Sequence, residues 1–303
     1  MPELDDFEKD LERLLKVYRF DAPPPDFRRV TPMAARRQRR WPALAAAAAI
    51  VVVIGAAMLY PRRNDWRIEG RLSRLSAGEV VRATRDVRLS SRAVGVVDVA
   101  AGTTLRLVEN QHRHRIALEA GTIHARTISP PGLFIVDTPR ARAIDLGCEY
   151  VLTVANDGSG TLRVTSGWVA LRHDWAESFV PQGAAASIGA NGQLSAPVFE
   201  DASPEFRAAA SNFARDHDVA TVTRLARPRD LLTLLSLFRP ATSEERVLLY
   251  DAVTRLLPHD APRVSREAVR YWEPETTEGW WRYALRAANI GPLKKPKGML
   301  WTR

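Results

Sequence analysis

The chain has 303 residues, of which 46% are hydrophobic and 26% charged, and its formal net charge is +9 at pH 7. These fractions are close to globular averages, so wholesale disorder, a collagen repeat and a coiled-coil rod are disfavoured, and the length suffices for two domains. A single cysteine excludes an internal disulfide framework and a zinc site built on several thiolates. Most of the basic residues are scattered arginines, which favours dispersed surface charge over direct nucleic-acid binding.

Residues 1–40 contain one element, an amphipathic helix that the spacing of apolar residues predicts before a Pro- and Arg-containing linker. A short lone helix cannot bury its apolar stripe, so it would dock on a partner protein, a second copy or a membrane surface. Its acidic opposite face argues against an anionic bilayer. Partner binding and a weakly ordered tail both remain open. The candidate partner-binding residues of this tail are Leu4, Phe7, Leu11, Leu14, Leu15 and Tyr18.

Residues 41–60, WPALAAAAAIVVVIGAAMLY, carry no ionisable side chain except that of Tyr60. A helix of this length rises about 30 Å, the thickness of the hydrocarbon core of a bilayer. Arginines lie on both sides, and Trp41 and Tyr60 occupy the positions of an aromatic belt. The segment therefore predicts a retained transmembrane helix with the tail in the cytoplasm, and cleavage after the small residues 55–57 is the alternative.

Residues 66–200 show strand periodicity, with short β-branched runs separated by glycine turns. The pattern predicts an all-β domain, either β-solenoid-like or a sandwich. The turn glycines, where a positive φ is expected, are Gly78, Gly102, Gly121, Gly167 and Gly183. The expected strands are Val94–Val99, Thr103–Val108, Arg115–Leu118, Leu133–Val136, Tyr150–Val154, Thr161–Thr165 and Trp168–Arg172.

Residues 203–303 change to helical patterning and predict a small all-α bundle. Thr242 and Glu245 form a capping box before an apolar run, and Ser265 is expected to cap a short helix. Trp280 and Trp281 diverge by about 100° on a helix, so either one is partly exposed as an interface anchor or both are shared in packing. The predicted fold class is thus multi-domain: one transmembrane helix, the all-β domain, then the bundle.

The β-region contains, in this order, the pieces IALEAGTIHA (116–125), VDTPRARAIDLGCEY (136–150), LRVTSGWVAL (162–171) and VPQGAAASI (180–188). Together these four pieces resemble the extracytoplasmic domain of the FecR family, whose members are membrane-spanning regulators associated with extracytoplasmic-function sigma factors. The family has Leu-Gly-Thr-x-Phe where this chain has residues 146–150, LGCEY. Its classical members also have a longer cytoplasmic part and a different C-terminal region. The resemblance implies a signalling role through protein binding.

Residues that could carry chemistry are few. Cys148 lies in an apolar strand run and is expected to be a buried, inert thiol. His112 and His114 alternate on one strand face, where a solvated polar strand is favoured over a metal site because no third ligand lies nearby. The run 216–218, DHD, is expected at a helix terminus or in a loop. No nucleotide-binding or hydrolase motif occurs, so the sequence predicts neither an enzyme nor a cofactor or metal site.

The leading hypothesis is therefore a FecR-like single-pass regulator of the inner membrane, similar to an anti-sigma factor. Its tail would contact a cytoplasmic partner, possible partners including a sigma factor, and its periplasmic β-domain would bind an envelope protein or ligand. A change of partner affinity or of proteolytic susceptibility would carry the signal. The alternative is a membrane-tethered envelope scaffold or binding module with no signalling role, whose partners would contact the β-domain or Trp280 and Trp281 alone.

Overall fold

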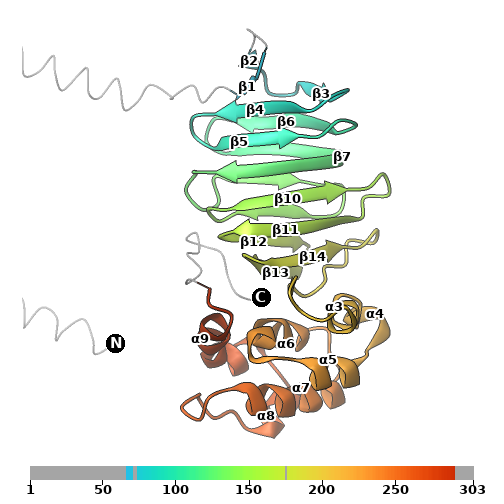
Figure 1. The fold of residues 1–303 in the computed structure, drawn as a ribbon, viewed down its shortest axis with the longest axis vertical. Coiled ribbons are helices and arrows are strands. Elements are labelled where there is room, and N and C mark those ends of the chain that lie inside the picture. The colour runs from blue at the N-terminus through green and yellow to red at the C-terminus, as the bar shows by residue number, and fades with distance from the viewer. Residues whose placement is uncertain (1–65, 71–73, 175, 291–303) are drawn as a thin grey trace, which may run out of the picture. The chain divides into compact units, whose positions relative to one another are not determined.

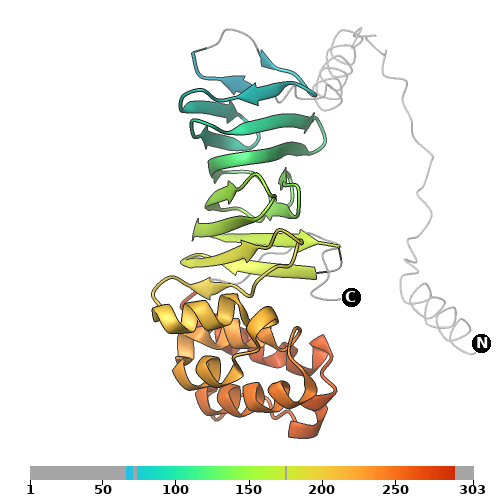
Figure 2. The same ribbon diagram turned by 90° about the vertical axis from the view of Figure 1, so that its right-hand side faces the viewer.

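The computed structural model describes residues 66–70, 74–174 and 176–290. By its internal contacts the chain divides into Met1–Tyr60 and Pro61–Arg303, and all described residues lie in the second unit. The predicted tail helix and the predicted membrane helix at 41–60 therefore lie outside the described residues. Figure 1 and Figure 2 show the second unit from two directions, with strands followed by helices along the chain.

Several strands form where apolar and polar residues alternate, so that such a strand turns one side inward, whereas β8 and β12 are continuous buried runs. In β10, for example, Tyr150, Leu152 and Val154 are buried while Thr153 is exposed. The strands are β1 Trp66–Ile68, β2 Arg74–Leu75, β3 Val80–Arg82, β4 Val87–Ser91, β5 Gly95–Val99, β6 Thr104–Asn110, β7 His114–Thr127, β8 Phe134–Asp137, β9 Arg142–Asp145, β10 Glu149–Val154, β11 Gly160–Ser166, β12 Trp168–His173, β13 Ala176–Pro181, β14 Ala184–Ile188 and β15 Val198–Phe199.

These fifteen strands are hydrogen-bonded into one sheet with two layers. The first layer has the order β2-β1-β4-β5-β7-β10-β11-β14-β15, and the second has the order β3-β6-β7-β8-β9-β12-β13. Neighbours run antiparallel except β7 and β8, which are parallel. Because β7 belongs to both layers, it is the strand that holds them together.

The β7 strand changes layers at Gly121. Its first half, up to Ala120, pairs with β6, and its second half pairs with β5 and β10. Gly121 has a φ of +105°, and a Cβ there would lie 2.5 Å from the Cα atom of Thr103. The positive φ predicted for the five turn glycines is confirmed. At Gly121, however, the sequence predicted a turn between two strands, whereas the strand continues through the corner.

The helices follow from residue 204 and begin at residues that cap them. Ser203, Thr242 and Ser265 each accept a hydrogen bond from the backbone of the first turn, and the Thr242–Glu245 capping box is confirmed. The helices are α3 Pro204–Ser211, α4 Phe213–Asp216, α5 Val219–Leu225, α6 Leu231–Leu237, α7 Ser243–Leu256, α8 Arg266–Arg270 and α9 Glu278–Ala287, with short 3₁₀ helices η1 Pro228–Asp230 and η2 Pro274–Thr277.

The helices pack directly on the last strands. The Thr233 hydroxyl of α6 donates to the Pro197 carbonyl at 2.8 Å, and the Arg229 guanidinium lies 4.7 Å from the centre of the Phe199 ring of β15. Buried residues of strands and helices, from Trp66 to Ile290, belong to one hydrophobic cluster. The free edge of β15 is thereby covered, as sheet edges in soluble proteins commonly are.

The predicted fold class is wrong. The described residues form one unit, a large and mainly antiparallel β-sheet with a few helices that share its core, in place of a separate all-β domain and all-α bundle. Among these residues, no helix has the length and apolar character needed to cross a bilayer. Helical periodicity alone could not show that the apolar faces of the helices meet the sheet rather than one another. The predicted domain boundaries remain predictions.

Removing the cap of α7 tests how much local capping contributes to the stability of the folded chain. Thr242→Ala deletes the hydroxyl that accepts from the Glu245 backbone N–H, and we expect the free energy of unfolding to fall by about 1 kcal/mol. Thr254 is the matched control, because its hydroxyl bonds to the Tyr250 carbonyl within the same helix and Thr254→Ala leaves both helix ends intact. Urea unfolding followed by circular dichroism measures both. Equal losses in the two variants would contradict the capping role.

Candidate protein-binding surface

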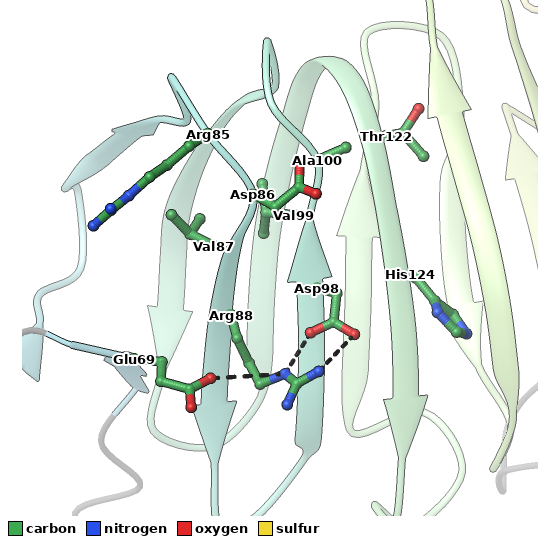
Figure 3. Close-up of a pocket in the computed structure, with 10 residues that line it drawn as sticks. All are labelled: Glu69, Arg85, Asp86, Val87, Arg88, Asp98, Val99, Ala100, Thr122 and His124. Carbon is green, nitrogen blue, oxygen red and sulfur yellow. Dashed lines mark hydrogen bonds and ion pairs between the residues drawn. The ribbon is translucent and has the colours of Figure 1, made fainter.

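A hollow of about 640 Å³ lies on the outer face of the first layer, over β4, β5 and β7. Outward side chains line it because they alternate with buried ones: Arg88 precedes the buried Leu89, and Asp98 lies between the buried Val97 and Val99. Figure 3 shows the lining side chains, which are Glu69, Arg85, Asp86, Val87, Arg88, Asp98, Val99, Ala100, Thr122 and His124.

Ion pairs connect the strands across this face. The Arg88 Nε atom lies 2.5 Å from Asp98 Oδ1, and Arg126 Nη2 lies 2.5 Å from Asp98 Oδ2. Arg126 Nη1 contacts His124 Nδ1 at 3.3 Å, and His124 Nε2 contacts Glu149 Oε1 at 2.8 Å. A guanidinium can only donate, so His124 accepts at Nδ1 and donates from Nε2 to Glu149. We refer to Arg88, Asp98, Arg126, His124 and Glu149 as the charged ladder.

Strand register explains the charged ladder. Arg88 pairs across from Asp98, Asp98 from His124, and Arg126 from Glu149, so all five side chains emerge on the same face of four neighbouring strands. Side chains directly or diagonally opposite on one face are close enough to interact. The residues are far apart in the sequence and carry no motif, and the only available signal was the period-two alternation of charged and apolar residues. Sequence analysis therefore missed this surface.

The charged ladder is partly exposed. The side chains retain between 31% and 49% of their exposure, so they can contact a partner. The hydrogen bond from Arg88, with that from Arg126, holds the pKa of the Asp98 carboxyl below its ordinary value despite partial burial. Exposed ion pairs contribute only about 0–1 kcal/mol to stability. Their main physical consequence here is that they fix the direction of several charged groups beside the hollow.

Of the residues predicted as partner-binding, the structure describes only Trp280 and Trp281, and neither lines the hollow. The tail residues Leu4, Phe7, Leu11, Leu14, Leu15 and Tyr18 lie outside the described residues. Trp280, on α9, is 1% exposed and donates from Nε1 to the Pro262 carbonyl at 2.7 Å. Trp281 is half-buried and packs against the core. Their role in partner binding stays a prediction, and the half-buried Trp281 is the one that retains surface for it.

Cys148 is buried as expected, and its surroundings add a group that the sequence did not reveal. Its thiol donates to the Asp145 carboxylate, which also accepts from the Ser129 hydroxyl at 2.9 Å. Burial, reinforced by the Asp145 carboxyl, raises the pKa of Cys148 well above its ordinary value. Burial also raises the pKa of Asp145 itself. The only sign of this buried carboxyl in the sequence was an acidic residue in an otherwise apolar run.

The Cys148 thiol is expected to resist alkylation in the folded protein, since alkylation requires both the thiolate form and access. Iodoacetamide added to the native chain at neutral pH should leave it unmodified, and the same reagent in denaturing urea should modify it fully, as intact-mass measurement would show. A surface cysteine introduced by Ser159→Cys is the positive control for native labelling. Native modification of Cys148 at the rate of that control would contradict this assignment.

The two histidines of QHRHR lie in different environments. His112 is exposed in a bend, whereas His114 begins β7 and is fully buried. The expected solvated polar strand is thus wrong for His114.

The run 216–218 is confirmed at helix ends: Asp216 ends α4, His217 follows it with a φ of +52°, and Asp218 caps α5. Within the described ranges, no three His, Cys, Asp or Glu side chains are grouped so that they could hold a metal.

Comparison with known proteins finds no family for the chain and only distant structural similarity. No protein-family model and no curated protein matches the chain. Two solved structures, both of a proposed anti-sigma factor from Parabacteroides distasonis, are similar to it with 20% identity and a TM-score of 0.32. The similarity covers 42% and 45% of this chain and only 58% and 61% of theirs. Their description agrees with a regulatory role, but similarity this low carries no argument, and membership of the FecR family is not confirmed.

Proposed function

We propose that the chain is a regulator that acts by binding a protein partner, in the manner of an anti-sigma factor, and that it catalyses no reaction. The observation that carries this proposal is the charged ladder beside the hollow on the first layer. Fixed charges of both signs beside a concavity suit recognition of a complementary protein surface, because electrostatic complementarity governs specificity and the rate of association. Arginine is also enriched at protein interfaces.

The state of the ionisable groups supports binding rather than catalysis. A general acid or base is usually marked by a pKa moved toward the working pH. In the charged ladder the shift is in the opposite direction, since the pKa of Asp98 is lowered and its carboxylate is held by two guanidinium groups. Asp145 and Cys148, whose pKa values are raised, are buried away from the hollow and are not among the residues that line it.

A paired substitution tests the surface. Arg88→Gln with Arg126→Gln removes two positive charges from the charged ladder while keeping side-chain length, and Arg106→Gln removes one exposed arginine that pairs with Glu119 in the second layer. Sigma factors of the same genome, co-expressed with the affinity-tagged full chain, are the probe. We expect one of them to co-purify with the unaltered chain and with Arg106→Gln, and to be lost from the double variant.

The outcomes separate the two functions. Retention of a sigma factor that depends on Arg88 and Arg126 supports the regulator. If no sigma factor is retained by the unaltered chain, the signalling proposal fails and the structural binding module becomes the better reading. If retention depends only on residues 1–22, a sigma-factor role survives but the ladder is not its binding surface. The predicted placement of the tail in the cytoplasm and of the rest outside stays a prediction.

A further inference from the structure

The first strand of the sheet is tied to the central strand by one buried hydrogen bond between side chains. The indole Nε1 of Trp66, in β1, donates to Nδ1 of His114, in β7, at 3.2 Å. The two rings meet edge to face with their centres 6.1 Å apart, and Phe134 of β8 packs on the indole at 5.8 Å. Trp66 and His114 are both 0% exposed, so this contact excludes water.

The hydrogen bond fixes the protonation state of His114. Because Trp66 donates to Nδ1, the neutral ring carries its proton on Nε2. That Nε2 atom is itself buried and makes no hydrogen bond within the described residues. A second proton could be added only at Nδ1, which would remove the acceptor of Trp66 and leave two N–H groups facing apolar rings. Charging this histidine inside the folded layer is therefore strongly disfavoured.

We propose that the contact between Trp66 and His114 is an acid-sensitive latch that holds β1 on the sheet. β1 has only three residues and pairs with β2 and β4, so it is held by few backbone hydrogen bonds. When His114 takes up a proton, the ring becomes stable only in contact with water, and the indole that covers it has to withdraw. Residues 1–65 join the sheet at β1, so opening the latch would free the strand through which they are attached. The inference requires no partner and is independent of the proposed function.

The direction of the pH effect follows from the groups around the ring. Burial lowers the pKa of His114 below its ordinary 6.5, and Glu109 of β6 opposes this only in part. Trp66 of β1, which contacts the ring, and Phe134, which pairs with His114 from β8, carry no charge. A histidine with a lowered folded-state pKa contributes stability above the unfolded pKa and loses it as the pH falls. The latch is thus closed at neutral pH and weakens below about pH 6.5.

Hydrogen exchange on the purified full chain, followed by mass spectrometry, tests the latch. After correction for intrinsic exchange, protection of the peptide containing β1 should fall by up to about tenfold between about pH 7.5 and about pH 5.5. Protection of β10, in the middle of the first layer, should change little. His114→Asn keeps an acceptor near the position of Nδ1 but cannot take up a proton, so its β1 protection should not depend on pH.

A second variant keeps the test decisive if His114→Asn does not fold. Trp66→Phe preserves an aromatic ring but removes the donor, so β1 protection should already be lower at about pH 7.5 than in the unaltered chain. An unaltered chain whose β1 protection is the same at both pH values would overturn the latch. So would an undiminished fall in His114→Asn, or undiminished protection of β1 in Trp66→Phe at about pH 7.5, because another group would then be responsible.

Discussion

Gly121→Ala is expected to lower the free energy of unfolding by about 3–5 kcal/mol, which is a large part of the stability of a typical domain. Two costs combine. A φ of +105° is unfavourable for any residue with a side chain, and the new Cβ would lie 2.5 Å from the Cα atom of Thr103. The Thr103 backbone, just before β6, cannot rotate away as a long side chain can. Since β7 changes layers here, the strain falls on the strand that both layers share.

Gly102→Ala separates these two costs. Gly102 also has a positive φ, +82°, but a Cβ there would meet nothing within 4 Å. Only the backbone cost of about 1–2 kcal/mol is expected at this position. Thermal and urea unfolding of the two variants give the comparison. If both variants lose the same stability, close approach at the β7 corner contributes nothing, and the account of how the layers are joined is incorrect.

Local patterns predicted the parts of the fold that depend on local forces. The Thr242–Glu245 capping box lies within four residues, and the glycine turns need only a positive φ, so both could be inferred from neighbouring residues. Strand alternation in β10 was equally visible. What could not be inferred is the pairing of distant strands. The stretch Arg115–Leu118 was expected to be a short strand, yet it belongs to the 14-residue β7 that joins two layers.

The candidate surface was missed for the same physical reason. Asp98 and Arg126 are 28 positions apart, and they meet only because β5 and β7 pair in one particular register. A shift of one residue would turn one of them into the core. His114 shows the converse: the polar run QHRHR predicted exposure, but His114 is buried in β7 and its ring packs edge to face on Trp66. Tertiary pairing therefore decides which polar residues reach the surface.

The adjacent tryptophans of α9 offer a sharp comparison between packing and recognition. Trp280 is 1% exposed, its ring lies 6.0 Å from that of Tyr250 in α7, and its N–H is satisfied by the Pro262 carbonyl. Trp280→Ala removes a fully buried ring and leaves a cavity, so we expect a loss of about 3–5 kcal/mol in the free energy of unfolding. Trp281→Ala should lower the free energy of unfolding by less than half as much, because Trp281 is half-buried and folding removes less of its apolar surface from water.

Stability and binding should therefore respond differently to the two substitutions. If Trp281 anchors a partner, Trp281→Ala reduces co-purification of that partner at a temperature where the chain is still fully folded, as circular dichroism would verify. Trp280→Ala should reduce binding only in proportion to the fraction unfolded, and cooling should restore it. Equal destabilisation by the two substitutions would place both rings in the core. The predicted interface at α9 would then have no aromatic anchor, and partner binding would depend on the charged ladder of the first layer.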